Sequence, residues 1–521
     1  MFYTEKRDGF ARLGVLEING LSIRTPAMLE GDILKKIDFG KAPYAVKKIL
    51  PDVYEKLKPK GEIEILTGLP TMSPREIADA FSELRSVKPL FAVACADPKN
   101  ASLLIYLGAD LVDNVMAVAK AYRGIYFLND LEVKIEKLKA FPCNCKFCKS
   151  QELSKLSKDE ILEITALHNT EELKREVEKC KILIEEEDLR NYVEAKAKLN
   201  PEFTALLRFA DLEESPCFPR FRRSTCFFNS QESISRFEVR YFLSRIVECY
   251  RPKTRALLLL PCTAKKPYLL SKTHRLIRSA VKVNVNEIII SSPLVLPREF
   301  ELIYPAVNYD TPVTGHWSEE EINFVASWLL KLVEKGNFEK IVAHVEGGYR
   351  RVVEKALKDY DVIFTSEGDL LSSESLKRLK KEIEGFERFD LFSEMFSHAS
   401  RYQFGLEAEG IVRGKYPEIE LLKKDRVARF DLRYGNLDIY SDFAIELLKR
   451  GDYTVEIADF EPTTTIFSAG VEEADPKIRP NDVVVFRNST HYGVGIARMH
   501  GREMVETKKG IAVEVRRKYR F

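Results

Sequence analysis

The segment PCTAKKPYLLSKTH, from Pro261 to His274, concentrates side chains that can do covalent chemistry. A cysteine thiolate is a nucleophile, a lysine ammonium group lowers the pKa of a nearby thiol and stabilises negative charge, and a histidine moves protons near neutral pH. We therefore interpret Cys262 as a nucleophile assisted by Lys266, Ser271 and His274, and we treat all four as catalytic candidates. The alternative is a helix-capping loop that carries an inert, buried cysteine.

Two elements are predicted to position this segment. Residues 255–260, RALLLL, form an apolar run that suits a buried strand and is too short for a membrane span. Ligands of open α/β sheets bind beyond the carboxyl ends of the strands, so this strand would deliver Cys262 to such an edge. If Ser271 caps the helix predicted over 272–283, His274 lies one turn along it and faces the same pocket.

The surrounding sequence predicts a small three-layer α/β sandwich with parallel strands. Further strands are predicted over 285–292, 340–344 and 361–365, with a helix over 318–335. Polar residues fall at the predicted strand ends and in the loop before that helix. Those interpreted as substrate-binding are Tyr268, Ser291, Ser292, Asp310 and His316, while His344 and Glu346 lie at another strand end.

A second cluster has the spacing of a metal site. Cys143, Cys145 and Cys148 fall within six residues, and His168 follows in a helical pattern that could return its ring to them. Three thiolates and one imidazole complete a tetrahedral zinc shell with no open position, so we predict a structural Zn²⁺ ion. The alternative is a set of reduced cysteines beside a core histidine.

The composition indicates a multidomain chain, for which we expect no membrane contact. Its 521 residues exceed what one hydrophobic core supports, and 45% of them are hydrophobic and 31% charged. The N-terminus has no apolar signal segment and no run approaches bilayer length, so we expect a cytoplasmic protein. Nine cysteines in a cytosolic chain of this size favour metal binding or catalysis over a disulfide framework.

Positive charge is concentrated at the C-terminus. Residues 476–521 contain eleven Lys or Arg and four Asp or Glu, a net charge of +7, whereas the whole chain carries only +2. The other residues therefore carry −5. A basic terminal module on a mildly acidic body indicates a local contact with nucleic acid.

Changes in pattern divide the chain into five segments. Short apolar runs alternate with helical patterns at the N-terminus, which predicts a β/α barrel or another parallel α/β unit. Short strands separated by Gly and Pro turns predict a small β-barrel at the C-terminus. The predicted segments are a zinc-binding barrel over 1–200, a linker over 201–236, an α/β catalytic domain over 237–388, a small α+β module over 389–470 and the β-barrel over 471–521. For the basic cluster Arg220–Arg223 in the linker we favour a connecting role over an RNA contact.

Three parts of the chain resemble one group of RNA-modifying enzymes. The spacing PC-x3-KPY-x2-S-x2-H at residues 261–274 resembles the signature of archaeosine synthases, the archaeal paralogues of tRNA-guanine transglycosylase. The segment GADLVDN at 108–114, and the C-x-C-x2-C cluster with its later histidine, are similar to the transglycosylase barrel and its structural zinc site. Residues 471–521 resemble a PUA domain, which in that family grips the tRNA acceptor end through phosphate contacts.

The transglycosylase resemblance is incomplete. Asp113 falls where that family carries its nucleophilic aspartate, but the Ser-Gly-Gly-Phe-Gln segment that carries the second essential aspartate has no counterpart here. Base exchange needs two carboxylates, one to form the glycosyl-enzyme bond and one to move protons. We therefore expect a structural or vestigial role for Asp113.

The resemblance implies a tRNA-modifying transferase. Its substrate would be tRNA that already carries 7-cyano-7-deazaguanine at position 15 of the D-loop, and its reaction would add an amine to the nitrile. Free lysine is the donor that we favour, and glutamine or ammonia is the alternative. A lysine adduct would need a radical SAM partner enzyme to cleave it to archaeosine.

Two other functions stay open at this point. The chain could exchange bases as a transglycosylase, which incorporation of labelled free base into unmodified tRNA would reveal. It could instead be a non-catalytic tRNA-binding subunit, whose tRNA affinity would not respond to substitutions in the motif. The sequence also leaves open whether Cys262 bonds to the substrate or only shapes its pocket, which tRNA features are read, and whether the chain forms a homodimer.

Overall fold

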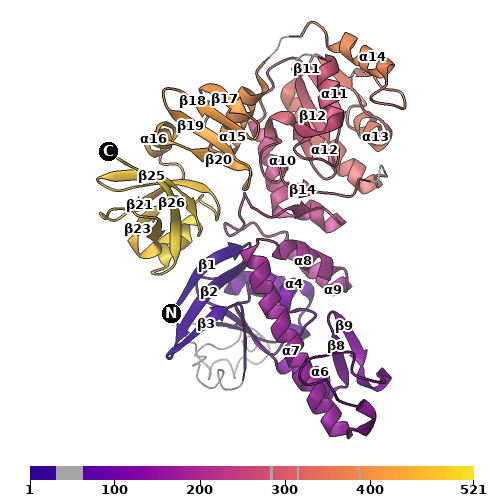
Figure 1. Cartoon of the computed structure of the whole chain (residues 1–521), viewed down its shortest axis with the longest axis vertical. Coiled ribbons are helices and arrows are strands. Elements are labelled where there is room, and N and C mark those ends of the chain that lie inside the picture. Colours follow the sequence, from indigo (N-terminus) through magenta and orange to yellow (C-terminus); the bar gives the residue numbers. More distant parts are fainter. Residues whose placement is uncertain (31–62, 282–284, 314–315, 387–388) are drawn as a thin grey trace. The chain divides into compact units, whose positions relative to one another are not determined.

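The structure, a computed structural model, describes residues 1–30, 63–281, 285–313, 316–386 and 389–521 (Figure 1). These residues form two compact units. Unit 1 comprises Met1–Pro219, Thr463–Pro480 and Ala497–Glu514, and unit 2 comprises Arg220–Pro462, Asn481–Ile496 and Val515–Phe521. The C-terminal segment therefore contributes residues to both units. No helix among the described residues is long and apolar enough to cross a bilayer.

Unit 1 begins with two sheets. The antiparallel sheet consists of β1 (Phe2–Asp8), β2 (Ala11–Ile18) and β3 (Leu21–Thr25) in that order. The parallel sheet has the order β4-β7-β6-β5 and consists of β4 (Ala27–Leu29), β5 (Glu64–Leu66), β6 (Leu90–Ala92) and β7 (Leu111–Asp113). Buried side chains of both sheets, among them Leu16, Leu29, Phe91 and Leu111, form one hydrophobic core.

This arrangement is a parallel α/β unit, as the sequence predicts, but it differs from a complete β/α barrel. The described residues supply four parallel strands, and such a barrel closes with eight. The closed barrel expected over 1–200 is therefore not formed by the described part of the chain.

The helices of unit 1 connect and cover these strands. They are α4 (Pro74–Leu84), α5 (Ala101–Leu107), α6 (Val115–Tyr122), α7 (Lys158–Glu185), α8 (Leu189–Ala197), α9 (Pro201–Ala210) and α17 (Gly501–Glu506). α7 starts with a capping box, in which Ser157 Oγ accepts from Glu160 N and the Glu160 carboxylate accepts from Ser157 N. β8 (Ile125–Leu128) and β9 (Leu131–Lys134) form a hairpin, and α7 packs against α6 and β8.

The segment 201–236, expected to be a linker, contains regular and buried structure. α9 packs against α4 and α8 and buries Leu206 and Leu207. Further along the segment, Arg220 forms an ion pair with Asp482 at 3.2 Å, and Arg222 pairs with Glu238 at 3.0 Å. Both arginines are buried and paired inside unit 2, whereas Arg223 of the same cluster is exposed.

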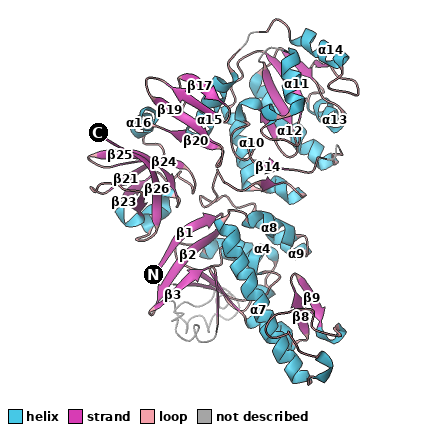
Figure 2. Cartoon of the chain, viewed as in Figure 1, coloured by secondary structure: helices cyan, strands magenta, loops and turns pink. Residues whose placement is uncertain are grey.

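Unit 2 contains a five-stranded sheet, and one of its strands leads into the motif of residues 261–274 (Figure 2). Its order is β13-β12-β11-β15-β16. The strands are β11 (Ala256–Pro261), β12 (Asn286–Ile290), β13 (Val295–Pro297), β15 (Lys340–Ala343) and β16 (Val362–Phe364). The four predicted strands are parallel, and β13 adds an antiparallel edge strand.

Helices pack against the sheet of unit 2. Ala256, Leu258 and Leu260 share a core with Ile277 of α11 (Lys272–Val281) and Leu379 of α14 (Ser373–Ile383). Side chains alternate along a strand, so the intervening residues of β11 point to the opposite face. The remaining helices are α10 (Phe237–Cys249), α12 (Glu319–Gly336) and α13 (Gly347–Ala356). α12 packs against both α10 and α13. This part of unit 2 therefore combines a mostly parallel sheet with helices, as expected for a mixed α/β domain.

The rest of unit 2 is an α+β module followed by strands from the C-terminal segment. The module contains α15 (Leu391–Phe404), an antiparallel sheet of β17 (Ile411–Lys415), β18 (Glu418–Leu422), β19 (Arg426–Asp431) and β20 (Asn436–Ile439), and α16 (Ser441–Arg450). β21 (Thr454–Ile457) pairs in parallel with β24 (Val483–Arg487), which pairs antiparallel with β25 (His491–Ala497). In unit 1, β22 (Thr465–Phe467) pairs antiparallel with the first residues of β26 (Ile511–Arg520), and β23 covers Val471–Ala474. A two-stranded pair of β10 (Cys226–Phe227) and β14 (Tyr309–Asp310) completes unit 2.

Candidate functional site

Cys262 stands at the carboxyl end of β11, where the sequence places it. Its backbone N–H donates to the carbonyl oxygen of Ile290 on β12 at 3.0 Å. Its Sγ lies 3.2 Å from the hydroxyl oxygen of Tyr349. Of the nine cysteines, Cys262 and Cys143 are half-buried and the other seven are buried. The Cys262 thiol is therefore held in place and still reachable.

A small pocket opens beside Cys262. The residues that line it are Cys262, Ser292, Thr311, Pro312, Val313, His316, Trp317, Glu321 and Tyr349. A larger pocket of about 450 Å³ shares five of these residues and extends to Phe228 and Gln231. Pockets of this size hold small organic ligands. Of the residues predicted from sequence, Ser292 and His316 lie in the pocket wall with Cys262.

Four other predicted residues lie around Tyr309 next to this pocket: Tyr268, Ser291, Lys266 and Asp310. Tyr268 and Ser291 are buried, whereas Asp310 is exposed. The Tyr309 hydroxyl donates to Ser291 Oγ at 2.8 Å and contacts the hydroxyl of Tyr268. Burial raises the pKa of both phenols, so they stay protonated near neutral pH. The Lys266 ammonium lies 4.5 Å from the centre of the Tyr309 ring and 3.4 Å from Asp310 Oδ1. Lys266 therefore contacts both residues of β14.

His274 has a different environment from the one expected. The ring is fully buried, its Nε2 donates to the carbonyl oxygen of Pro261 at 2.9 Å, and its Nδ1 accepts from Arg298 Nη2 at 2.6 Å. Burial, reinforced by the Arg298 charge, lowers the pKa of His274 to about 3. A neutral imidazole with both nitrogens engaged cannot shuttle protons for the pocket, so the predicted proton-transfer role is not supported by this geometry.

Ser271 and the residues of the second predicted strand end form hydrogen bonds within the fold. Ser271 Oγ accepts a hydrogen bond from the backbone N–H of His274 at 3.1 Å, which is the helix-capping role expected for it. His344 is buried and contacts Thr365 Oγ1 at 2.9 Å and the carbonyl oxygen of Leu370 at 2.8 Å. The carboxylate of Glu346 accepts from Gly368 N at 3.0 Å. These groups hold neighbouring loops and do not line the pocket beside Cys262.

The predicted metal ligands converge in unit 1. The thiols of Cys143 and Cys145 and a ring nitrogen of His168 all lie within 4.8 Å of one another, so this cluster could hold a metal ion. Cys148 Sγ lies 3.5 Å from His168 Nδ1 as well. His168 Nε2 donates to the carbonyl oxygen of Phe127 at 2.7 Å. This bond turns Nδ1 toward the thiols, which is the outer-shell arrangement common among metal-bound histidines.

Asp113 lies at the end of β7 with its carboxylate engaged by backbone groups. Oδ2 accepts from Ala94 N at 2.9 Å and Oδ1 accepts from Val115 N at 3.0 Å, and the residue is 1% exposed. Burial raises the pKa of this carboxyl group. Both oxygens tie backbone segments together, which agrees with the structural role expected for Asp113.

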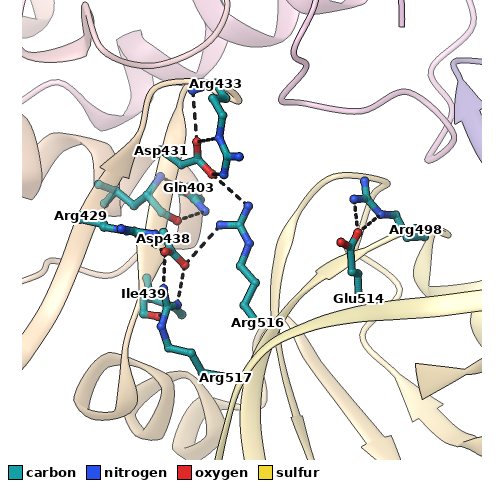
Figure 3. Close-up of polar contacts among 11 residues, drawn as sticks. Gln403, Arg429, Asp431, Arg433, Asp438, Ile439, Arg498, Glu514, Arg516 and Arg517 are labelled. Atoms are coloured by element: carbon teal, nitrogen blue, oxygen red, sulfur yellow. Dashed lines mark hydrogen bonds and ion pairs between the residues drawn. The ribbon is translucent and has the colours of Figure 1, made fainter. Parts of the chain in front are cut away.

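Much of the positive charge of the C-terminal segment is neutralised within the protein. Arg517 forms a two-point ion pair with Asp438, with N–O distances of 2.6 and 2.7 Å, and Arg516 Nη2 lies 3.0 Å from Asp431 Oδ2 (Figure 3). In unit 1, Arg498 Nε donates to Glu514 at 2.9 Å (Figure 3). Asp431 and Asp438 lie outside residues 476–521, so their pairing with Arg516 and Arg517 reduces the positive charge that this segment presents below its net of +7.

Models of four known families match successive parts of the chain. Queuine tRNA-ribosyltransferase matches residues 67–202, a domain of unknown function (DUF5591) matches 239–383, a pre-PUA domain matches 389–448 and the PUA domain matches 462–519. Archaeosine synthase subunit alpha of Methanosarcina acetivorans is 36% identical over 88% of this chain and 80% of its own length. Archaeosine synthase of Haloferax volcanii is 32% identical over 99% of this chain and 98% of its own length.

The chain belongs to the archaeosine synthase family. This confirms the family resemblance of the motif and makes the chain a member of a group of tRNA-modifying enzymes. A tRNA-guanine(15) transglycosylase of Methanothermobacter thermautotrophicus is more distant, with 23% identity over 85% of this chain and 68% of its own length. A crystal structure of a protein of unknown function is 55% identical, covers 54% of this chain and 99% of that chain, and superposes with a TM-score of 0.50.

Three pocket residues of this family member were not identified from sequence. Tyr349, Trp317 and Glu321 are distant from the motif along the chain, and the tertiary structure brings them to the same pocket. One signal was available for Tyr349. It follows the pair Gly347 and Gly348, which come shortly after the apolar run of β15, and paired glycines beyond a strand indicate close backbone approach at a functional edge.

Proposed function

We propose that this chain adds an amine to the nitrile of 7-cyano-7-deazaguanine at position 15 of the tRNA D-loop, with free lysine as the donor. Membership in the archaeosine synthase family supports the substrate. The observation that carries the mechanism is the half-buried thiol of Cys262 in the wall of a pocket at the carboxyl end of β11.

The thiol suits this reaction because a nitrile carbon is a weak electrophile. The sulfur of Cys262 bonds to the nitrile carbon and gives a thioimidate. A neutral primary amine then attacks the same carbon, the carbon–sulfur bond breaks, and the product is an amidine with the thiol restored. In this scheme His274 is a positioning residue, because it holds the carbonyl of Pro261 and not the substrate.

The acidic side of the pocket supports lysine over glutamine as the donor. Glu320 and Glu321 line the larger pocket, and Glu321 also lines the small pocket of Cys262. The carboxylate of Glu321 accepts from Ser292 Oγ at 2.9 Å, which fixes its direction. Carboxylates there attract a cationic amino acid, and the uncharged side chain of glutamine gains nothing comparable. The lysine adduct then requires a radical SAM enzyme as the next catalyst.

The cysteine and histidine cluster of unit 1 fits a structural zinc ion. Cys143, Cys145 and Cys148 would supply three thiolates and His168 its Nδ1, which fills a tetrahedral shell. Such a site stabilises the loop between β9 and α7 and leaves no position for substrate. Its role is to hold this part of unit 1 in shape.

The PUA segment supports binding of tRNA through phosphate contacts. Arg502 and Lys508 are exposed cationic residues of this segment. Contacts of this kind position the RNA without reading its sequence, and they weaken as salt is raised.

Nucleoside analysis tests the proposal. The protein is incubated with nitrile-containing tRNA and isotopically labelled lysine, glutamine or ammonium, and the tRNA nucleosides are analysed by mass spectrometry. We expect a lysine adduct of the nitrile base, its absence in Cys262→Ala, and its retention in the control Cys249→Ala, which changes a buried cysteine of α10. Turnover by Cys262→Ala at the unsubstituted rate would contradict the nucleophilic role, and release of free base without an adduct would indicate base exchange.

A further inference from the structure

Tyr349 brings a hydroxyl into direct contact with the proposed nucleophile. Its Oη lies 3.2 Å from Cys262 Sγ, although the two residues are 87 positions apart in sequence. Both side chains line the same small pocket. A substrate carbon that reaches the sulfur must therefore lie close to this hydroxyl as well.

The packing of the ring fixes where this hydroxyl points. Tyr349 lies in the first turn of α13 and packs edge to face on Trp317, with ring centroids 5.2 Å apart and an interplanar angle of 70°. Gly348 allows this approach, because a Cβ built on it would lie 2.5 Å from Trp317 Cδ1. A ring held in this way presents its hydroxyl to the sulfur before any substrate arrives, which is the preorganisation that proton transfer needs.

Other polar side chains near Cys262 form hydrogen bonds with partners other than the thiol. His274 bonds to Pro261 and Arg298, and the Tyr309 hydroxyl bonds to Ser291. The carboxylate of Glu321 accepts from Ser292 Oγ and from the backbone N–H of Ser318. The hydroxyl of Tyr349, by contrast, contacts the sulfur of Cys262. Burial raises the pKa of Tyr349, so this hydroxyl keeps its proton near neutral pH.

We propose that Tyr349 is a catalytic residue that relays the proton of the Cys262 thiol to the nitrile nitrogen. The inference rests on the proposed function. As sulfur bonds to the nitrile carbon, the thiol proton passes to the Tyr349 oxygen and the phenolic proton passes to the nitrogen, which leaves a neutral thioimidate and a neutral tyrosine. When the neutral amine displaces sulfur, the amine loses one proton, and the same hydroxyl returns a proton to the leaving thiolate. Lysine attacks in its deprotonated form, and the proton of its ammonium group passes to solvent before the second step. The two steps consume no oxidant or reductant.

The substitution Tyr349→Phe removes one oxygen atom and keeps the ring against Trp317. The rate of formation of the covalent adduct on Cys262 is measured by mass spectrometry of the full-length protein mixed with nitrile tRNA in the absence of amine. General acid–base groups contribute about 10²–10⁴-fold to such steps, so we expect adduct formation to slow at least about 100-fold. The KM for tRNA should stay unchanged. A solvent deuterium isotope effect on the unsubstituted protein should shrink in Tyr349→Phe, which loss of packing alone would not cause.

Tyr360→Phe is the matched control, because Tyr360 is an exposed tyrosine beyond the end of α13. It should leave adduct formation unchanged. The proton relay is overturned if Tyr349→Phe forms the adduct at the unsubstituted rate. It is also overturned if the unsubstituted protein consumes lysine without an adduct on Cys262, an outcome that leaves the proposed function standing. Absence of turnover with every donor would overturn the proposed function and the relay together.

Discussion

The imidazole of His274 ties the end of β11 to Arg298. Its Nε2–H donates to the carbonyl oxygen of Pro261 at 2.9 Å, and its Nδ1 accepts from Arg298 at 2.6 Å. Because Cys262 is the next residue after Pro261, this ring sets the position of the backbone that carries the thiol. The histidine of the motif thus acts on Cys262 through the main chain.

His274→Gln should alter the acid stability of the protein. The pKa of His274 is lowered to about 3 in the folded state, against about 6.5 in an unfolded chain. At pH values between these two pKa values, the unfolded state therefore binds more protons than the folded state does. Ionisation of His274 thus destabilises the fold as the pH falls below about 6.5. We expect the melting temperature of His274→Gln to decline less steeply from pH 6.5 to pH 4, with a difference in free energy of about 1.4 kcal/mol per pH unit.

Thermal melting at a series of pH values checks this expectation. His316→Gln is the control, because His316 is an exposed histidine of the same unit. Identical slopes for His274→Gln and the unsubstituted protein would contradict the assigned environment of the ring.

Glu321→Gln should weaken the use of lysine and leave tRNA binding intact. The substitution keeps an oxygen that can accept from Ser292 Oγ and removes the negative charge from the pocket. Hydrogen bonds to charged groups contribute about 1.5–3 kcal/mol, so the KM for lysine should rise about 10- to 100-fold. Steady-state kinetics with varied lysine and varied tRNA separate the two effects.

Glu319→Gln serves as the control for that experiment. Glu319 is exposed on the same helix, pairs with Arg351 and does not line either pocket. A lysine KM that rises equally in both variants would argue for a general charge effect and against a donor site at Glu321.

Cys145→Ser should remove the bound metal and lower the stability of unit 1. Loss of one thiolate opens the predicted tetrahedral shell, and structural zinc contributes directly to folding. Elemental analysis should give about one zinc per unsubstituted chain and a large loss in Cys145→Ser, with a lower melting temperature. Cys262→Ser, a half-buried cysteine of unit 2, should retain the metal. Equal zinc content in the two variants would rule out the proposed ligand set.

Lys508→Ala and Arg517→Ala should differ in their effects on tRNA binding. Lys508 is exposed, so its loss should reduce the slope of log K against log salt by about 1 if it contacts a phosphate. Arg517 is held by Asp438, and that pairing lowers the pKa of the aspartate. Its removal should lower the melting temperature by taking away one of the three arginines that pair with the buried carboxylate of Asp438, with little change in the salt slope. Filter binding at several salt concentrations and thermal melting measure the two effects. If Arg517 were the phosphate contact, Arg517→Ala would reduce the salt slope and Lys508→Ala would leave it unchanged.

Local sequence was sufficient for the parts of the protein that depend on near neighbours. The apolar run before Cys262 predicts β11, and Ser271 predicts the start of α11. The spacing of three cysteines and His168 predicts a cluster that the fold brings together. The motif of residues 261–274 was specific enough to identify the family. Each of these signals comes from residues close in sequence or from a fixed spacing.

The tertiary structure alone decided which of these side chains share a site. His274 fits the pattern of a pocket residue, yet packing turns its ring into the core, where Arg298 and a backbone carbonyl occupy both nitrogens. Tyr349 carries no strong signal of its own, yet the order β12-β11-β15 places the helix after β15 beside the end of β11. The charges of Arg516 and Arg517 look available in the sequence and are paired in the fold. The physical reason is that burial and partner choice are set by contacts between elements far apart in the chain, and local patterns carry no information about those contacts.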